Sequence, residues 1–156
     1  MQSTMLNTLS QFLSMDFAPA RVEDHPERTL QLATAVLLIE VMRSDADCAD
    51  VEQAAILKIL KERFHLSNEE VAQLTERGLR IAMTANDFQQ FTSLINRELE
   101  LSEKIRIIEY MWQVAYADGK IDAHENHLLR KIAGLLYIPH DDYIAAKMRA
   151  KPADLK

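Results

Sequence analysis

Two acidic segments separated by a constant offset constrain the fold of this chain more than any other feature. The clearer copy, AYADGKIDAHE, runs from Ala115 to Glu125, and a weaker copy, SDADCADVE, runs from Ser44 to Glu52. Residues of the weaker copy correspond to residues of the clearer copy at one constant offset in residue number, the offset that separates Asp45 from Asp118. The clearer copy has the pattern of a helix end, a glycine break and a new helix start. The chain therefore contains a duplicated helix–loop–helix unit.

The repeat extends beyond the acidic segments. At the same offset, and without a gap, the following positions match: Leu32 with Ile105, Ala35 with Ile108, Val41 with Val114, Lys58 with Lys131, Ile59 with Ile132, Phe64 with Tyr137, and Ala72 with Ala145. We expect two helix–loop–helix–short-helix halves, about 28–75 and 101–149, packed about a pseudo-two-fold axis, with 87–101 as their connector.

Composition favours an all-α domain. The chain of 156 residues has only 3 Gly and 4 Pro with 48% hydrophobic residues, which leaves few turns for an all-β fold and enough apolar surface for one core. We expect a single domain of about seven to eight helices over 25–150, preceded by an N-terminal helix and linker over 1–24.

Hydrophobic spacing and capping residues place the helices. The expected segments are Ser3–Met15; Pro26 to about Ser44; Asp50–His65; a helix from the Ser67–Glu70 capping box to Met83, with Gly78 as a weak point; Asp87–Leu99; Glu103–Ala117, capped by Ser102; a helix from Asp122 through Leu136, ended by Pro139; and a last helix from Asp141 or Asp142 to about Arg149. The stretch Ala33–Met42 is apolar on nearly every side, which predicts that the second helix is central.

Charge and cysteine content exclude several classes. A net charge of −6 and a pI of about 5.4 argue against a nucleic-acid partner. Cys48 is the only cysteine, so there is no disulfide framework. The longest apolar run, Ala35–Ile39, is too short to cross a bilayer, and Met1–Phe17 lacks a signal-peptide pattern. We expect a cytoplasmic protein that is not inserted in a membrane.

The acidic segments are the candidate site. Asp118 and Glu125 flank a glycine turn, and Asp45 and Glu52 repeat their spacing, so four carboxylates could share one cation across the pseudo-axis. The same residues also suit a structural role, because Asp122 with Glu125 forms a capping box and carboxylates at helix starts complement the helix dipole. Both interpretations remain open at this stage.

Glu40 interrupts the most apolar stretch of the chain. A carboxylate buried there is costly unless it is paired, and it lies just over one turn before Asp45. It either joins the acidic site or reaches water at the edge of the apolar face.

Two metal motifs are incomplete. The segment beginning at Asp118 fits the second half of an EF-hand loop, but Val114 and Tyr116 fall on ligand positions of the first half. His124 and His127 are one residue too close for a zinc-protease pair, which favours a solvated surface pair.

The segment from Val114 to Asp122, followed by Glu125, Leu128 and Ile132, resembles the signature of the tellurite-resistance B (TerB-like) family, whose fold is shared by the N-terminal domain of DjlA-type co-chaperones. The upstream stretch Leu37–Val41, with Asp45 and Glu52, resembles the first half of the same domain, and the resemblance covers about Thr29 to Met148. It implies an all-helical domain of two related halves with clustered acidic residues that bind divalent metal. Those residues correspond to Asp45, Glu52, Asp118 and Glu125, with Glu40 in support.

The sequence thus favours a non-enzymatic interaction or regulatory module that binds Ca²⁺ or Mg²⁺. The alternative is a structural protein–protein adaptor whose acidic residues serve only as helix caps. No nucleophile motif or phosphate loop supports an enzyme. The expected partner is an unidentified protein, and a homodimer is left open.

Overall fold

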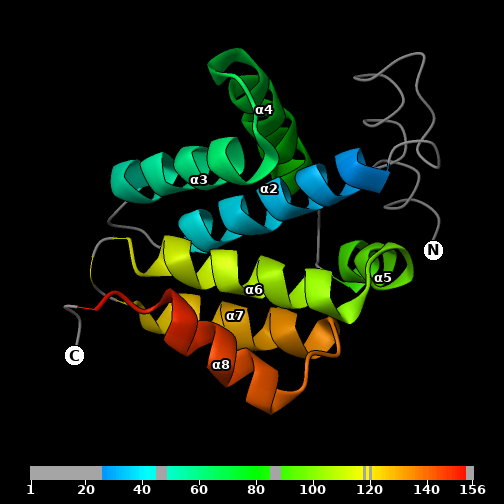
Figure 1. The fold of residues 1–156 in the computed structure, drawn as a ribbon, viewed down its shortest axis with the longest axis vertical. Helices are drawn as coiled ribbons and strands as arrows, with labels where there is room; N and C mark the ends of the chain where they lie inside the picture. The colour runs from blue at the N-terminus through cyan, green and yellow to red at the C-terminus, as the bar shows by residue number, and fades with distance from the viewer. Residues whose placement is uncertain (1–25, 45–48, 85–88, 118, 120, 154–156) are drawn as a thin grey trace.

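The computed structural model describes residues 26–44, 49–84, 89–117, 119 and 121–153. Within them the chain forms seven helices and no strand (Figure 1). The helices are α2 (Pro26–Ser44), α3 (Ala49–Phe64), α4 (Asn68–Thr84), α5 (Gln89–Glu98), α6 (Leu101–Ala115), α7 (Ala123–Leu135) and α8 (His140–Ala150). The expectation of an all-α fold is confirmed, whereas the expected helix Ser3–Met15 and its linker lie outside the described residues.

Helix α2 is the centre of the molecule, as its sequence predicts. It packs against α3, α4, α5, α6 and α7, and residues 32–39 are all buried. Thr34 is the polar residue within this run, and its hydroxyl donates a hydrogen bond to the Leu30 carbonyl oxygen at 2.6 Å. The hydroxyl therefore has a partner inside its own helix, which removes most of the cost of burying it.

The helix contacts follow a pseudo-two-fold arrangement. Helix α2 packs against α6, its own equivalent, and the crossed pairs α2–α7 and α3–α6 are both present, as are the equivalent pairs α2–α4 and α6–α8. Helices α2 and α6 run in the same direction, so the ends that lead into α3 and α7 lie at the same end of the molecule (Figure 1). The two halves therefore face each other as the repeat predicts.

The repeat is not free of gaps, which corrects the sequence alignment. His65 and Tyr137 both have φ of 55°, and each ends its helix in the left-handed conformation. Hydrogen bonds from Leu66 N to Lys61 O and from Ile138 N to Ala133 O, both 3.0 Å, close the two ends in the same way. The offset between these equivalent positions is one position shorter than the offset between the acidic segments. The second half has therefore lost a residue by this point.

Burial supports the shorter offset in the third helix of each half. With the offset that relates His65 to Tyr137, Val71 pairs with Tyr143 and Leu74 with Ala146, and all four side chains are buried. The expected matches of Phe64 with Tyr137 and Ala72 with Ala145 are therefore wrong. They matched similar side chains and missed the single-residue deletion at the helix end.

A glycine lets α4 approach α2 closely. A Cβ atom placed on Gly78 would lie 3.0 Å from Ile39 Cδ1 and 3.3 Å from Ala35 Cβ. Gly78 is itself buried, in a helix that shows no break there. The interpretation of Gly78 as a weak point of the helix was therefore incomplete, because its missing side chain makes room for α2.

Local capping explains where α4 and α6 begin. Ser67 Oγ accepts a hydrogen bond from Glu70 N at 3.1 Å, and Glu70 Oε1 accepts one from Ser67 N at 2.8 Å, which is the predicted capping box. Helix α6 begins two residues earlier than expected, because Glu100 rather than Ser102 is its N-cap. Glu103 Oε1 accepts from Glu100 N at 3.0 Å, and so ties the first turn to the residue before it.

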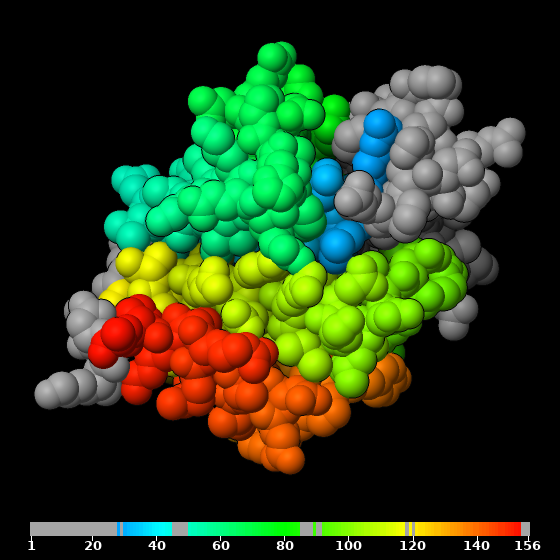
Figure 2. Space-filling model, viewed as in Figure 1, coloured from blue at the N-terminus to red at the C-terminus, as the bar shows by residue number. Residues whose placement is uncertain are grey.

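Helix α5 lies between the two halves in the sequence and covers the seam between α2 and α7. Asn96 Nδ2 donates to Leu135 O at 2.8 Å, at the end of α7, and Lys104 Nζ donates to Asn96 Oδ1 at 3.1 Å. On the face drawn in Figure 2, α6 (yellow) lies between α3 (teal) above and α8 (red) below. Among the described helices, none contacts both α3 and α6 at that seam in the way that α5 contacts both α2 and α7.

Candidate cation site at the two elbows

The two elbows of the fold are the connections from α2 to α3 and from α6 to α7. The second elbow, between α6 and α7, turns as the sequence predicts. Gly119 has φ of +82°, a left-handed conformation that is strained for residues with a Cβ atom. Its N–H donates to Tyr116 O at 2.9 Å, which closes the turn after α6. The backbone therefore favours a glycine at this position, whatever the elbow binds.

Asp122 and Glu125 form the predicted capping box at the start of α7. Asp122 Oδ1 accepts from His124 N at 2.6 Å, and Glu125 Oε1 accepts from Asp122 N at 3.1 Å. The Glu125 side chain is directed back toward the elbow and is completely buried. Burying a carboxylate is costly, so its location at a helix start, where the dipole favours negative charge, matters for stability.

Glu52 is the equivalent residue in the first half, and it is also completely buried. In α3, however, Ala49 stands where α7 has Asp122, so the side chain of that position cannot act as a cap acceptor. Glu52 thus matches Glu125 in burial without the complete capping box that surrounds Glu125. A capping role alone explains Glu125 better than it explains Glu52.

The other two predicted ligands, Asp45 and Asp118, lie outside the described residues. The structure therefore does not place the four carboxylates together. Over the described ranges, no group of three or more His, Cys, Asp or Glu side chains is arranged to hold a metal ion. Figure 1 shows that the starts of α3 and α7, which carry Glu52 and Glu125, lie at the same end of the α2–α6 pair.

Glu40 lies near the first elbow and has a partner within the fold. Its Oε1 is 3.0 Å from Arg43 Nη1, and the same nitrogen donates to Ala82 O at 3.0 Å. Arg43 therefore joins Glu40 to the C-terminal turn of α4. Burial raises the pKa of the Glu40 carboxyl above its ordinary value, and the nearby Arg43 charge only partly opposes this.

Comparison with known families identifies the domain. The family model described as "Tellurite resistance protein TerB" matches residues 31–148, most of the chain. The protein belongs to the TerB family. No curated protein and no solved structure matches it significantly. None of the helices that the structure describes is long and apolar enough to cross a membrane.

The structure also describes the other candidate residues of this TerB domain on α3 and α7. His124 and His127 are both exposed on α7, as expected for a solvated pair. Glu52 and Glu125 are the predicted ligands that the structure describes at the elbows. Their carboxylates provide hard, negatively charged oxygen ligands, which suit Ca²⁺ or Mg²⁺ better than a softer metal.

The raised pKa of Glu40 predicts a specific pH dependence. The folded state holds the Glu40 proton at pH values where the unfolded chain, with the ordinary pKa of 4.5, has lost it. The contribution of Glu40 to the free energy of unfolding therefore falls as pH rises from 4.5 through the raised value. Glu40→Gln, which imitates the protonated form, should become more stable relative to the wild type over that interval, as measured by urea unfolding at successive pH values.

Glu70→Gln provides the opposite control. In the wild type, a hydrogen bond from the Ser67 backbone N–H lowers the pKa of the exposed Glu70 carboxyl. The contribution of Glu70 to the free energy of unfolding is therefore lost as pH falls. If Glu40→Gln and the wild type show parallel stability profiles, burial does not govern the ionisation of Glu40.

Proposed function

We propose that this TerB domain is a non-enzymatic interaction module whose two elbows bind a divalent cation. The ligands would be Glu52 and Glu125, together with Asp45 and Asp118, with Glu40 in support. The observation that carries the proposal is the complete burial of two equivalent carboxylates, at the starts of α3 and α7. Buried carboxylates are retained in proteins when they are paired, hydrogen-bonded or bound to a metal.

The residues fit Ca²⁺ or Mg²⁺ in their chemistry. Such cations take carboxylate oxygens and keep water molecules in the rest of their coordination shell. Glu125 uses Oε1 to accept the Asp122 N–H, and a carboxylate has a second oxygen for another partner. Because both halves would contribute ligands, a bound cation would hold α3 and α7 in one relative position. It would thereby regulate a surface that binds a partner protein.

Glutamine substitution separates cation binding from capping. Glu52→Gln with Glu125→Gln keeps side-chain acceptors of the same size, including one for the capping box, but removes both negative charges. The wild type should release or absorb heat when titrated with CaCl₂ or MgCl₂. At a cation concentration 100 times the dissociation constant it should gain about 2.7 kcal/mol of stability. The double variant should lose the heat signal and the rise in melting temperature.

Asp122→Ala is the matched control. It removes the hydrogen bond to His124 N and should cost about 1 kcal/mol of stability, but the cation response should remain. A double glutamine variant that still responds to the cation would show that the ligand set is wrong. A wild type with neither heat nor a melting shift at saturating Ca²⁺ and Mg²⁺ would reject cation binding altogether.

The second candidate is a structural protein–protein adaptor without a ligand. The complete capping box of Asp122 and Glu125 favours it, because the hydrogen bonds of that box already give the Glu125 carboxylate a structural role. On this hypothesis Asp122→Ala lowers stability, no variant responds to cations, and binding of a partner protein or of a second copy of the chain is unaffected by chelators.

A further inference from the structure

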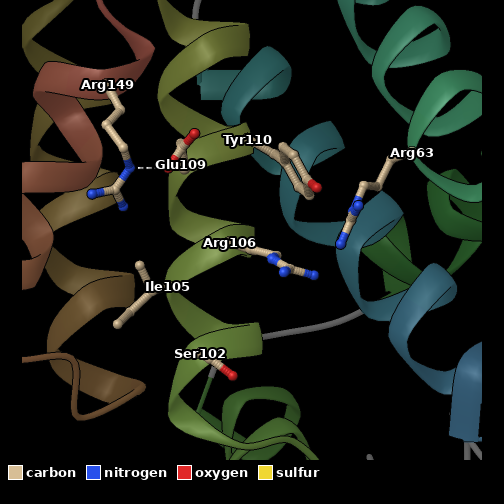
Figure 3. Close-up of a pocket in the computed structure, with 7 residues that line it drawn as sticks. All are labelled: Arg63, Ser102, Ile105, Arg106, Glu109, Tyr110 and Arg149. Atoms are coloured by element: carbon tan, nitrogen blue, oxygen red, sulfur yellow. Dashed lines mark hydrogen bonds and ion pairs between the residues drawn. The ribbon is translucent and has the colours of Figure 1, made fainter.

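An open groove of about 420 Å³ follows one face of α6, between α3 and α8 (Figure 3). Its floor consists of α6 residues three or four positions apart, the spacing of one helix face: Ser102, Ile105, Arg106 and Glu109, with Tyr110 alongside. Arg63 of α3 and Arg149 of α8 lie on opposite sides of this floor (Figure 3). From Ser102 to Tyr110 the floor is about 12 Å long, at 1.5 Å per helical residue.

The groove is positively charged on a protein whose net charge is −6. Of its three arginines, Arg149 is paired, with Nε at 2.6 Å from Glu109 Oε1. Among the described residues, no carboxylate lies within ion-pair distance of Arg63 or Arg106. Both guanidinium groups extend from their helices on the Tyr110 side of α6 (Figure 3). Both are planar cations with several N–H donors, and one hydrogen bond to Tyr110 leaves Arg63 with further donors for an acidic ligand.

Tyr110 lies beside these arginines, and its hydroxyl oxygen accepts a hydrogen bond from the Arg63 guanidinium. Burial raises the pKa of its phenol, and the neighbouring charges of Arg63 and Arg106 only partly oppose this. The hydroxyl is therefore protonated at neutral pH. Ile105, which is half-buried on the same floor, supplies an apolar contact beside the polar groups.

The pseudo-two-fold axis indicates the shape of the occupant. It relates the α3–α6 seam beside this groove to the α2–α7 seam, and α5 covers that second seam. The α2 positions that the repeat pairs with Arg106, Glu109 and Tyr110 of the groove are apolar and buried: Ala33, Val36 and Leu37. The groove thus corresponds to a face that is buried within the fold in the other half, with charged residues in place of apolar ones.

We propose that this groove receives an acidic, amphipathic helical segment of a partner protein, which packs beside the α3–α6 seam as α5 packs against α2 and α7. Carboxylates of the segment pair with Arg63 and Arg106, and an apolar side chain of the segment rests on Ile105. Pairs between guanidinium and carboxylate groups are strong and directional, which fixes the register of such a helix. The groove lies along α6 from Ser102 to Tyr110, and the second elbow follows the other end of this helix. The proposal does not depend on cation binding.

The test uses a display library of randomised 14-residue peptides selected on the wild-type protein. We expect enrichment of peptides that carry Asp or Glu with apolar residues at helical spacing. An enriched peptide, fluorescently labelled, is then titrated with the variant Arg63→Gln plus Arg106→Gln, and its affinity should fall about tenfold or more. The control Arg80→Gln plus Arg97→Gln changes the net charge equally on exposed arginines of α4 and α5, and should bind as the wild type does.

Circular dichroism and urea midpoints establish that both double variants are folded. The proposal is overturned if no peptide is enriched, if the enriched peptides are not acidic, or if their affinity is the same for both double variants. It is also overturned if pyrophosphate, and no peptide, binds the wild type and fails to bind Arg63→Gln plus Arg106→Gln, which would assign the groove to a small anion. The enriched peptide should also bind the variant Glu52→Gln plus Glu125→Gln, because the groove does not use these carboxylates. Peptide binding to that variant therefore tests the groove independently of the cation experiment.

Discussion

Gly78→Leu is expected to lower the free energy of unfolding by about 3 kcal/mol, a large part of the stability of a domain of this size. The new side chain would enter the contact between α4 and α2, where even a Cβ atom lies 3.0 Å from Ile39 Cδ1 and 3.3 Å from Ala35 Cβ. Ile39 can rotate its terminal methyl group, but the Cβ of Ala35 is fixed to the backbone of the central helix. The helices must separate, and the loss is measured by urea unfolding followed by circular dichroism.

Two further variants test this explanation. Gly134 lies in α7 with nothing within 4 Å of a Cβ atom, so Gly134→Leu should be neutral or stabilise the helix by up to about 1 kcal/mol. Gly78→Ala should be near neutral, because the gain in helix propensity offsets the mild crowding. If Gly78→Leu unfolds at the same urea concentration as Gly134→Leu, close contact of α4 with α2 is not what requires the glycine.

Gly78 also illustrates what the sequence could and could not predict. A glycine within a helical pattern lowers helix propensity, and that much is a local property visible in the sequence. The reason for its presence is the nearby surface of α2, which lies two helices earlier in the chain, and no local pattern identifies that neighbour. The same limit applies wherever a role depends on tertiary contact.

Properties that depend on a few neighbouring residues were predicted correctly. The capping boxes at Ser67–Glu70 and Asp122–Glu125 form as expected, because their hydrogen bonds join residues three positions apart. The start of α6 is an instructive exception. Ser102 is the better N-cap by residue type, but α6 begins at Leu101, so Glu100 is the N-cap residue.

The groove on α6 shows why a binding surface is harder to predict than a helix. Arg63, Arg106 and Arg149 are on three helices, and each alone has the pattern of an ordinary exposed charge. The signal that could have found them is the repeat itself. When the two halves are aligned, Arg106 and Tyr110 stand where the first half has the apolar Ala33 and Leu37, a difference that marks where the second half departs from the first.

Trp112→Ala is expected to have the largest effect of all, about 3 to 5 kcal/mol. Trp112 is completely buried in α6, with ring centroids 5.9 Å from Tyr116 and 5.6 Å from Tyr143, and Lys147 Nζ lies 4.9 Å from the ring. Tyr143 and Lys147 belong to α8, so the Trp112 side chain packs directly between α6 and α8. Trp112→Phe keeps an aromatic ring and should cost less than half as much.

The loss should be concentrated in α8, which distinguishes Trp112→Ala from a general weakening of the core. Amide hydrogen exchange in α8 should accelerate more than exchange in α2. Because Trp112 is the only tryptophan, unfolding must be followed by circular dichroism rather than by its fluorescence.

Arg149 lies on α8 and lines the groove, so Trp112→Ala should also weaken the binding of an acidic peptide in conditions where the variant is folded. Gly78→Leu disturbs α2 and α4, which do not line the groove, and should leave that affinity unchanged under the same conditions. Equal acceleration of exchange in α2 and α8 would mean that Trp112 stabilises the whole core rather than the attachment of α8.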